Sequence, residues 1–276
     1  MNALVSDAES TLRLAVFLGV LLVLALLEWR FPRRPLRHSK LRRWFSNFGI
    51  SFLNTVTVRL LLPIVGVGAA LLAAERGWGL FNVLTVPAWL SIPLFLLLFD
   101  LTIYFQHRLF HMIPVLWRLH RMHHTDLDYD VSTGNRFHPL SILLSSLIKL
   151  TLTVALGPPA VAVMIAEVLL NATSMFNHSN LRLPAKLDSG LRQLVVTPDM
   201  HRVHHSMDET EHNCNFGFNF PWWDRMFGTY LAQPRLGHDA MQIGIAGFED
   251  DRTMNLSSLL AQPFQDNSSK RSQPPA

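Results

Sequence analysis

Long apolar runs without charged residues constrain this 276-residue chain more than any other feature. The clearest are Leu14 to Leu27 and Val83 to Phe99, each at or just under the length of a helix that crosses the ~30 Å hydrocarbon core of a bilayer. Charged residues make up only 16% of the chain, against roughly 25% in soluble domains. We therefore expect an all-α fold, a polytopic membrane helical bundle.

The first apolar run is predicted to be retained as a membrane span. Its N-terminal flank sets Asp7 and Glu9 against a lone Arg13, and no small-residue cleavage site of the kind found in signal peptides follows it. The chain has a single cysteine, Cys214. One cysteine excludes an internal disulfide and a cysteine-based zinc or iron–sulfur site.

A basic segment between the first two apolar stretches sets the expected orientation. Residues 30–43 contain seven Lys or Arg, and such loops stay in the cytoplasm under the positive-inside rule. Contact of this loop with anionic lipid headgroups would place it on the same side. We therefore predict a cytoplasmic loop and no nucleic-acid partner.

Further apolar stretches predict the remaining crossings. The second span is expected from Phe48 to Ala74 and the third from Val86 to Phe105. Leu140 to Phe176 is interrupted by Gly157-Pro158-Pro159, and because proline stops helices, we expect two helices of about 16 residues, each about 24 Å long. The predicted architecture is about three full spans plus a helical hairpin, with a histidine-rich cap on the cytoplasmic side.

Eight of the 13 histidines fall into three clusters that this count places on one side of the membrane. Spacings of i, i+3 and i, i+4 put imidazole nitrogens on one helix face, and neutral imidazole binds transition metals such as iron and zinc. Eight imidazoles exceed what one ion can use, so we expect two metals. In each triplet the first two histidines are expected to share a face and the third to reach the neighbouring ion. The clusters are His107 and His111; His120, His123 and His124; and His201, His204 and His205.

A polar stripe on the third apolar helix points at the same site. Asp100, Tyr104, His107 and His111 are spaced by four, three and four residues and so share one face. An acid inside the membrane is costly, and a metal-bound imidazole commonly donates its second N–H to a carboxylate. Asp100 is therefore expected to support a ligand imidazole. The alternative is a structural bond to Arg59 or to a neighbouring backbone.

A second stripe ends at His178, the ninth ligand candidate. Glu167, Asn171, Ser174 and His178 again lie at offsets of four, three and four. A polar stripe on an apolar helix should face a cavity or the bundle interior, not lipid. We expect His178 to bind metal, and Asn171 could supply a carbonyl oxygen.

The remaining histidines carry weaker signals. His138, just before the hairpin, is a candidate ligand, a donor to a ligand or an interface residue. His212 is expected at the surface or beside a ligand. His38 and His238 lie far from the clusters in sequence and are expected in solvent.

The donor set leaves the metal open among iron, zinc and copper, because it is all imidazole and lacks thiolate. Structural zinc is satisfied by four ligands, whereas nine imidazoles around two ions leave open positions, as dioxygen chemistry needs. The alternative is a histidine-rich metal-binding or metal-transport membrane protein without oxidase activity. Transporters place their ligands near the bilayer midplane on broken helices, whereas these clusters follow helix ends.

Together these motifs resemble the fatty acid hydroxylase and sterol desaturase superfamily of integral-membrane enzymes, in its bacterial-type branch. The family's HxxxH box is similar to residues 107–111, and its two HxxHH boxes are similar to residues 120–124 and 201–205. His178 is similar to the isolated histidine that follows the family's helical hairpin. The resemblance covers roughly residues 90–232 and includes the flanking segments 215–219 and 222–229.

This resemblance implies a non-haem di-iron centre held by the nine histidines. With O2 as co-substrate, it would hydroxylate or desaturate a C–H bond of a lipid such as a fatty acyl chain, a sterol or an ether lipid. Because no fused cytochrome b5 domain is apparent, a separate electron-transfer protein is expected. The chemistry would take place at the metal centre, so no catalytic side chain is implied, and a bacterial inner membrane is favoured over the endoplasmic reticulum.

Three regions are expected along the chain. Residues 1–85 would form N-terminal transmembrane helices with the basic loop, residues 86–232 the catalytic domain, and residues 233–276 a C-terminal extension. Within the extension, the polar and proline-containing stretch from Gln262 to Ala276 is predicted to be a disordered tail.

Overall fold

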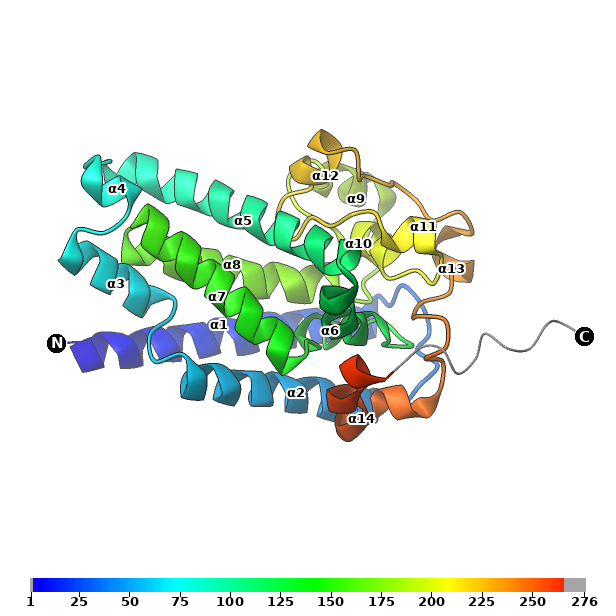
Figure 1. Cartoon of the computed structure of the whole chain (residues 1–276). Coiled ribbons are helices and arrows are strands. Elements are labelled where there is room, and N and C mark those ends of the chain that lie inside the picture. Colours follow the sequence, from blue (N-terminus) through cyan, green and yellow to red (C-terminus); the bar gives the residue numbers. More distant parts are fainter. Residues whose placement is uncertain (1, 266–276) are drawn as a thin grey trace, which may run out of the picture.

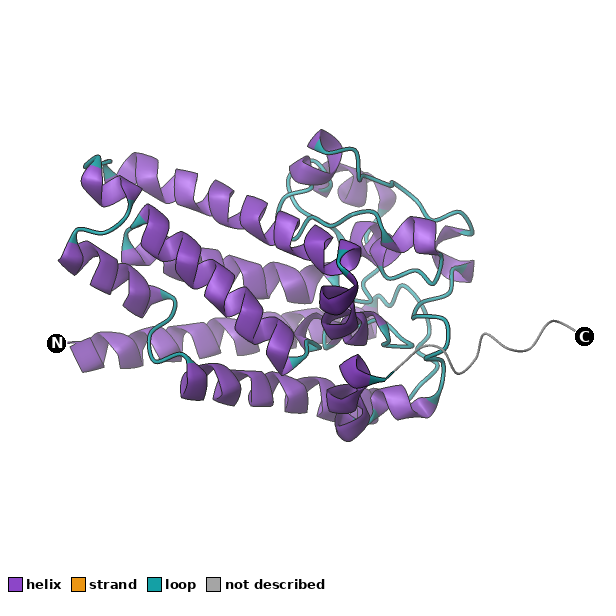
Figure 2. Cartoon of the chain, in the orientation of Figure 1, coloured by secondary structure: helices purple, strands orange, loops and turns teal. Residues whose placement is uncertain are grey.

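The computed structural model describes residues 2–265, with side chains from Glu9 onward. This part of the chain is built of helices and loops without a β-strand, which confirms the predicted all-α fold (Figure 2). The α-helices are α1 (Asn2–Arg30), α2 (Lys40–Leu61), α3 (Val67–Arg76), α4 (Leu80–Val83), α5 (Ala88–Met112), α6 (Pro114–His124), α7 (Pro139–Leu156), α8 (Ala160–Asn177), α9 (Ala185–Leu191), α10 (Pro198–His204), α11 (Glu209–His212), α12 (Trp222–Met226), α13 (Gly237–Ala240) and α14 (Leu256–Ala261). The 3-10 turns are η1 (Thr133–Asn135), η2 (Asp251–Met254) and η3 (Gln262–Phe264).

The long helices lie side by side as a bundle, and α6 and the short helices from α9 onward gather at one end of it, whereas α3 and α4 lie at the other end (Figure 1). We call this end the cap; it comprises α6, residues 125–138 and residues 178–265. Four helices are long and apolar enough to cross a membrane: α1 from Glu9, α5, α7 and α8. The helices α1, α5 and α8 all end at the cap (Figure 1). The prediction that all histidine clusters return to one end of the bundle is therefore confirmed.

The predicted second span from Phe48 to Ala74 is wrong as a single helix. The chain instead forms α2 and α3, with a break between Leu61 and Val67. Pro63 lies in the break and has no N–H for a helical hydrogen bond. Gly66 then adopts a φ of 56° at the N-cap of α3, a left-handed conformation that glycine reaches without strain. The two helices still lead away from the cap as one path (Figure 1).

The helix α2 has a polar inner face and an apolar outer face. Arg43 and Asn47 are fully buried in the bundle, whereas Leu41 and Phe45 are 83% and 74% exposed. A helix at the surface of a water-soluble domain shows the opposite pattern, with its apolar stripe facing the core. The inverted pattern suits a helix whose outer side meets lipid. The polar residues on its inner face lower the mean hydropathy of α2 below that of the four candidate membrane-spanning helices.

The hairpin prediction is confirmed, with slightly longer arms. The helices α7 and α8 have 18 residues each, or about 27 Å at 1.5 Å per residue. Gly157 ends α7 with a φ of 63°, and a Cβ atom there would lie 2.3 Å from the carbonyl oxygen of Trp78. Only glycine fits this turn, since both the backbone conformation and the close contact exclude a side chain.

The core between α5 and α8 leads directly to the cap. Phe95, Phe99 and Ile103 of α5 pack in one cluster with Ala162 and Ala166 of α8. The small alanines let the two helices approach closely, and the aromatic rings fill the space between them. Since His107 is one turn beyond Ile103, this apolar core ends at the histidines.

A buried ion cluster fastens α2 to the loop that follows α6. The Arg43 guanidinium donates to Asp126 at 2.7 and 2.8 Å and to Asp130 at 2.6 Å. Burial alone would raise the pKa of Asp126, but Arg43 holds that pKa well below its usual range. The cluster fixes residues 125–136, which connect the second histidine cluster to the hairpin. Sequence analysis did not anticipate it.

The C-terminal segment is ordered further than predicted. Gln262 is buried, and its side-chain amide donates to Thr125 at 3.0 Å. Arg118 and Arg121 of α6 donate to the carbonyl oxygens of Pro263 and Gln262. Residues 262–265 are therefore held against α6, so the predicted tail does not begin at Gln262. Its remainder, residues 266–276, lies outside the described residues.

Replacing Arg43 should destabilise the protein far more than replacing its neighbour Arg42. In Arg43→Met, Asp126 and Asp130 lose their buried counter-charge, which we expect to lower the free energy of unfolding by about 3–5 kcal/mol. In Arg42→Met, whose side chain is part-exposed, the loss should stay near 1 kcal/mol or less. Denaturant unfolding in detergent measures both, and equal losses would contradict the role of the cluster.

Candidate metal centre

All nine predicted ligand histidines come together at the junction of the bundle and the cap. They form two groups, and within each group the facing nitrogens all lie within 4.8 Å of one another. Group 1 contains His107, His111, His120, His124 and His204, and group 2 contains His123, His178, His201 and His205. Two separate groups match the expectation of two metal sites.

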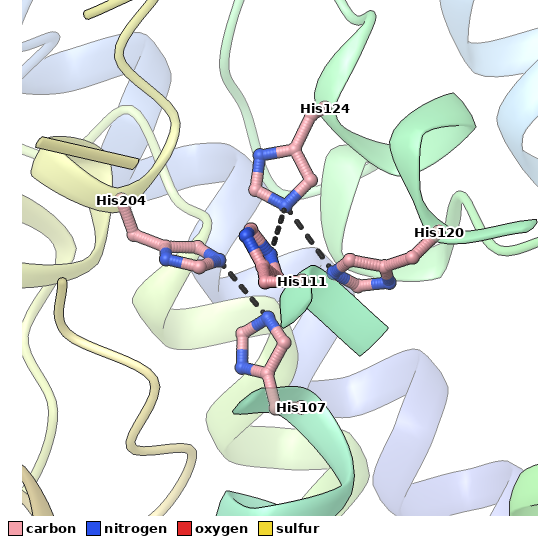
Figure 3. A group of neighbouring side chains, drawn as sticks. All are labelled: His107, His111, His120, His124 and His204. Carbon is pink, nitrogen blue, oxygen red and sulfur yellow. Dashed lines mark hydrogen bonds between the residues drawn. The ribbon is translucent and has the colours of Figure 1, made fainter. Parts of the chain in front are cut away.

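Group 1 is built from α5, α6 and α10, and its imidazole rings point toward a common centre (Figure 3). The Nε2 atom of His124 lies 3.1 Å from that of His111 and 3.2 Å from that of His120. On the other side, the Nε2 atoms of His204 and His107 are 2.9 Å apart. The last two turns of α5 supply His107 and His111, because this helix continues as predicted beyond the membrane span expected to end at Phe105 and reaches Met112.

Group 2 is arranged around His178, directly after α8. The Nε2 atom of His178 lies 3.0 Å from that of His123, 3.1 Å from that of His201 and 3.2 Å from that of His205. Thr197 caps α10, whose first residue is Pro198; a threonine at the N-cap and a proline at the first helical position are both typical of a helix start.

Each histidine triplet contributes to both groups, but the partition differs from the prediction. His120 and His124 enter group 1 while His123 enters group 2, and His201 and His205 enter group 2 while His204 enters group 1. The first and third histidines thus share a group, not the first and second. At 100° per residue, residues i and i+4 are about 40° apart, whereas i and i+3 are about 60° apart on the other side. The larger separation turns the middle histidine to the other group.

Backbone carbonyls orient four of the imidazoles. The Nδ1 atom of His107 lies 2.9 Å from the carbonyl oxygen of Phe216, and that of His204 lies 2.8 Å from the carbonyl oxygen of Cys214. His123 and His178 make the same contact with Arg136 and Ser174. Because a carbonyl oxygen only accepts, Nδ1 carries the proton and the Nε2 lone pair faces its group.

Burial keeps these rings in the form that binds metal. Burial lowers the pKa of His178 to about 3 and that of His124 and His205 well below the usual range. For His124 and His205 the neighbouring histidines add to this effect. A neutral imidazole keeps the Nε2 lone pair that a metal needs.

The geometry of each group fits one cation. Metal–imidazole bonds are about 2.0–2.1 Å long, so nitrogens on opposite sides of an ion lie about 4.2 Å apart, within the observed spread. Without a cation, the lone pairs of His107 and His204 would face each other at hydrogen-bond distance. Their Nδ1 protons are already committed to carbonyl oxygens. The donor set is therefore able to hold a metal ion in each group.

Asp100 does not contact a ligand imidazole. It instead makes structural hydrogen bonds to nearby backbone, which was the alternative prediction. Its carboxylate accepts from the N–H groups of Asn219 and Phe220 at 3.1 and 3.2 Å and from the Trp223 indole at 2.7 Å. Asp224 accepts from the N–H of Phe216 at 2.8 Å in the same loop. The two acids together hold the segment whose carbonyl orients His107.

Two further candidates lie away from the groups. Asn171 is exposed and lies seven residues before His178, about 10 Å along the helix, so it does not reach the site. His138 caps α7, where its Nδ1 atom accepts from the N–H of Leu140, and its Nε2 atom lies 3.2 Å from the carbonyl oxygen of Leu260. Both ring nitrogens of His138 thus contact backbone atoms. Of the three predicted roles, this corresponds to that of an interface residue.

The histidines outside the groups lie in different surroundings. His212 stacks on Trp117, and the Trp117 ring centre lies 4.8 Å from that of His111, so His212 does lie beside the ligands. His38 is partly exposed. The prediction that His238 is solvated is wrong, because residues around α13 bury it.

Aromatic rings close the site from the side of the core. The Phe137 ring stacks on His123 with centres 4.4 Å apart. Phe218 lies 5.8 Å from His107 and 6.1 Å from His201, centre to centre, and also belongs to the apolar core of α5 and α8. Sequence analysis noted the segment 215–219 only as part of the family resemblance, and it assigned no role to Phe137, to Phe218 or to the carbonyl partners.

A model of the fatty acid hydroxylase family matches residues 92–229, half of the chain. The chain belongs to this family. The match includes all nine histidines of the two groups and the segment from Phe216 to Phe218 that contacts them. No solved structure matches the chain significantly.

Similar curated proteins of this family act on several kinds of lipid. The chain is 29% identical over 178 residues to an ornithine lipid hydroxylase of Rhizobium tropici, covering 64% of this chain and 51% of that protein. It is 30% identical over 162 residues to the human alkylglycerol monooxygenase, covering 57% and 34%. It is also 30% identical over 170 residues to a delta(7)-sterol 5(6)-desaturase of Gibberella zeae, covering 62% and 44%. The chain thus spans about half or less of the length of these relatives.

Removing His178 should cost one metal ion, whereas removing Asn171 from the same helix should cost none. In His178→Ala, group 2 keeps three imidazoles and loses the one that its other members face, so we expect metal content to fall from about two ions per chain to about one. Asn171→Ala serves as the matched control. Inductively coupled plasma mass spectrometry of the purified proteins measures both, and unchanged metal in His178→Ala would contradict the second site.

Proposed function

We propose that this protein is a membrane-bound non-haem di-iron oxidoreductase. It uses O2 and electrons from a separate electron-transfer protein to hydroxylate or desaturate a C–H bond of a lipid. The observation that carries the proposal is the pair of neutral histidine groups at the end of an apolar helical bundle. Membership of the fatty acid hydroxylase family supports iron over zinc or copper.

The nine histidines would hold the two iron ions, which when bound supply the activation of dioxygen. The protein's own residues provide orientation and exclusion of water. Carbonyl oxygens of Phe216 and Cys214 fix the tautomers of His107 and His204. Phe137 and Phe218 cover the rings on the core side. No side chain is assigned as a catalytic acid or base.

The apolar core offers a direction from which a lipid chain would approach. The apolar cluster that contains Phe99 and Ile103 also contains Phe218. The Phe218 ring lies beside a histidine of each group. A hydrocarbon segment reaching Phe218 would lie beside ligand imidazoles of both groups. The names of the relatives support a lipid substrate, either a fatty acyl lipid, a sterol or an ether lipid.

The proposal includes a location and a division of the chain. The basic loop of residues 30–43 favours a cytoplasmic cap, and the similarity to a bacterial lipid hydroxylase favours a bacterial inner membrane. Residues 1–85 would supply membrane helices, residues 86–232 the catalytic domain and residues 233–276 an extension. Residues 262–265 of this extension pack on α6.

His204→Ala should abolish lipid oxidation, because it removes a group 1 ligand that faces His107. We expect a loss of at least about a hundredfold in activity with normal membrane insertion. His38→Ala removes a histidine outside both groups and serves as control. Protein purified anaerobically is assayed for iron and for lipid-dependent O2 consumption with a chemical reductant. Full metal occupancy without O2 chemistry on any lipid would instead favour a metal-binding or metal-transport protein.

Phe218→Leu should disturb the placement of the lipid without removing iron. Since reactivity falls steeply when reacting atoms move by about 1 Å, we expect turnover to fall by about tenfold to a hundredfold. The control is Phe220→Leu, because the Phe220 ring stacks on Trp222 away from the histidines. Product analysis by mass spectrometry and iron content together test this. Equal turnover in the two variants would argue against an approach past Phe218.

A further inference from the structure

A pocket lies in the cap, apart from the two histidine groups. Its volume is about 620 Å³, within the range of small-molecule sites. It is bounded by the loop after α1, by α9 and the residues on either side of it, by Asp199 in α10, by residues 230–233 and by α13. Its walls carry several charged and polar side chains, among them Arg33, Arg182, Asp188, Arg192, Tyr230 and His238.

The wall of this pocket contains a buried imidazole without a hydrogen bond. His238 is 5% exposed, and among residues 2–265 neither of its ring nitrogens finds a hydrogen-bond partner. The nearest carboxylate oxygen, on Asp199, is 3.8 Å from Nε2. Burial lowers the pKa of His238 to about 4, so the ring is neutral and carries one N–H donor. Native proteins rarely leave a buried polar group without a partner, because such a group loses its hydrogen bonds to water.

Arg192 offers a second unused donor in the same pocket. Its Nε atom lies 2.6 Å from Asp188, and its Nη1 atom donates to the carbonyl oxygen of Ala232 at 2.7 Å. Its Nη2 atom is buried and has no hydrogen-bond partner in the described part of the chain. Arg192 and His238 thus line the same pocket, each with a donor that has no partner among the described residues.

The charge balance of the pocket favours a negative ligand. Three arginines and three carboxylates line it, and a fourth arginine, the buried Arg202, lies beside Asp199 and His238. Asp239 is 75% exposed and Arg182 is also exposed, so solvent screens both of these charges. Asp199 is shared between Arg33 and Arg202. The floor of the pocket is left with positive charge and unsatisfied N–H groups.

We propose that this pocket binds an anionic oxygen group, a phosphate or a carboxylate, that accepts hydrogen bonds from His238 and Arg192. An acceptor with a negative charge satisfies both unused donors and the excess of guanidinium groups together. The group could be a free anion or part of a lipid headgroup, since Leu183 adds an apolar edge to the pocket. This site does not depend on the oxidation chemistry of the histidine groups.

Titration calorimetry on the full-length protein in neutral detergent tests the site. The two probes are inorganic phosphate and dihexanoyl phosphatidic acid, a short-chain lipid with a phosphate headgroup. The variants are His238→Phe and Arg192→Gln, and the control is Arg252→Gln, an exposed arginine paired only with Asp250 among the ion pairs of the described residues. We expect at least tenfold weaker binding in both pocket variants and no change in the control.

The outcomes separate the two sources of the anion. Binding of both probes identifies a free-anion site, and binding of the lipid alone identifies a headgroup site. If neither probe binds the unmodified protein, or if both pocket variants bind as tightly as it does, the proposal is overturned. Iron content and thermal unfolding show whether each variant is folded. If His238→Phe fails to fold, Arg192→Gln alone decides.

Discussion

The burial of nine neutral imidazoles with their lone pairs turned toward one another is the constraint on which the rest of this structure depends. Such an arrangement is unfavourable unless cations occupy the two centres. Four of the rings cannot turn away, because carbonyl oxygens accept hydrogen bonds from Nδ1 of His107, His123, His178 and His204. The loops that supply these carbonyls must therefore be placed accurately, and much of the cap serves that purpose.

Placement of these loops relies on charges buried inside an apolar bundle. Arg43 binds Asp126 and Asp130 on one side of the histidines, and Asp100 binds the backbone of Asn219 and Phe220 on the other. In a water-soluble domain most such charged groups would lie at the surface. Here the outer face of α2 is apolar, so polar residues are available to organise the interior and the histidine loops.

The sequence predicted the histidine sets, the hairpin and the meeting of all clusters at one end, because these follow from spacing and from apolar length. It did not predict the break between α2 and α3, where Pro63 and Gly66 override an apolar stretch. Nor could it decide whether His123 or His124 shares a group with His120. Their angular distances from His120 around the helix, about 60° and about 40°, differ by only about 20°. The carbonyls of Phe216 and Cys214 are invisible to motif analysis, because every residue has one. The burial of His238 depends on loops that only the fold brings together.

The segment from Asn215 to Asn219 connects the two halves of the proposed chemistry. Its Phe216 carbonyl orients His107, and its Phe218 ring belongs to the apolar core between α5 and α8. Asp100 and Asp224 hold the backbone around these residues. A change in the apolar core would therefore reach the histidines through only two or three residues. This one short loop thus couples the proposed space for the lipid to the imidazole geometry.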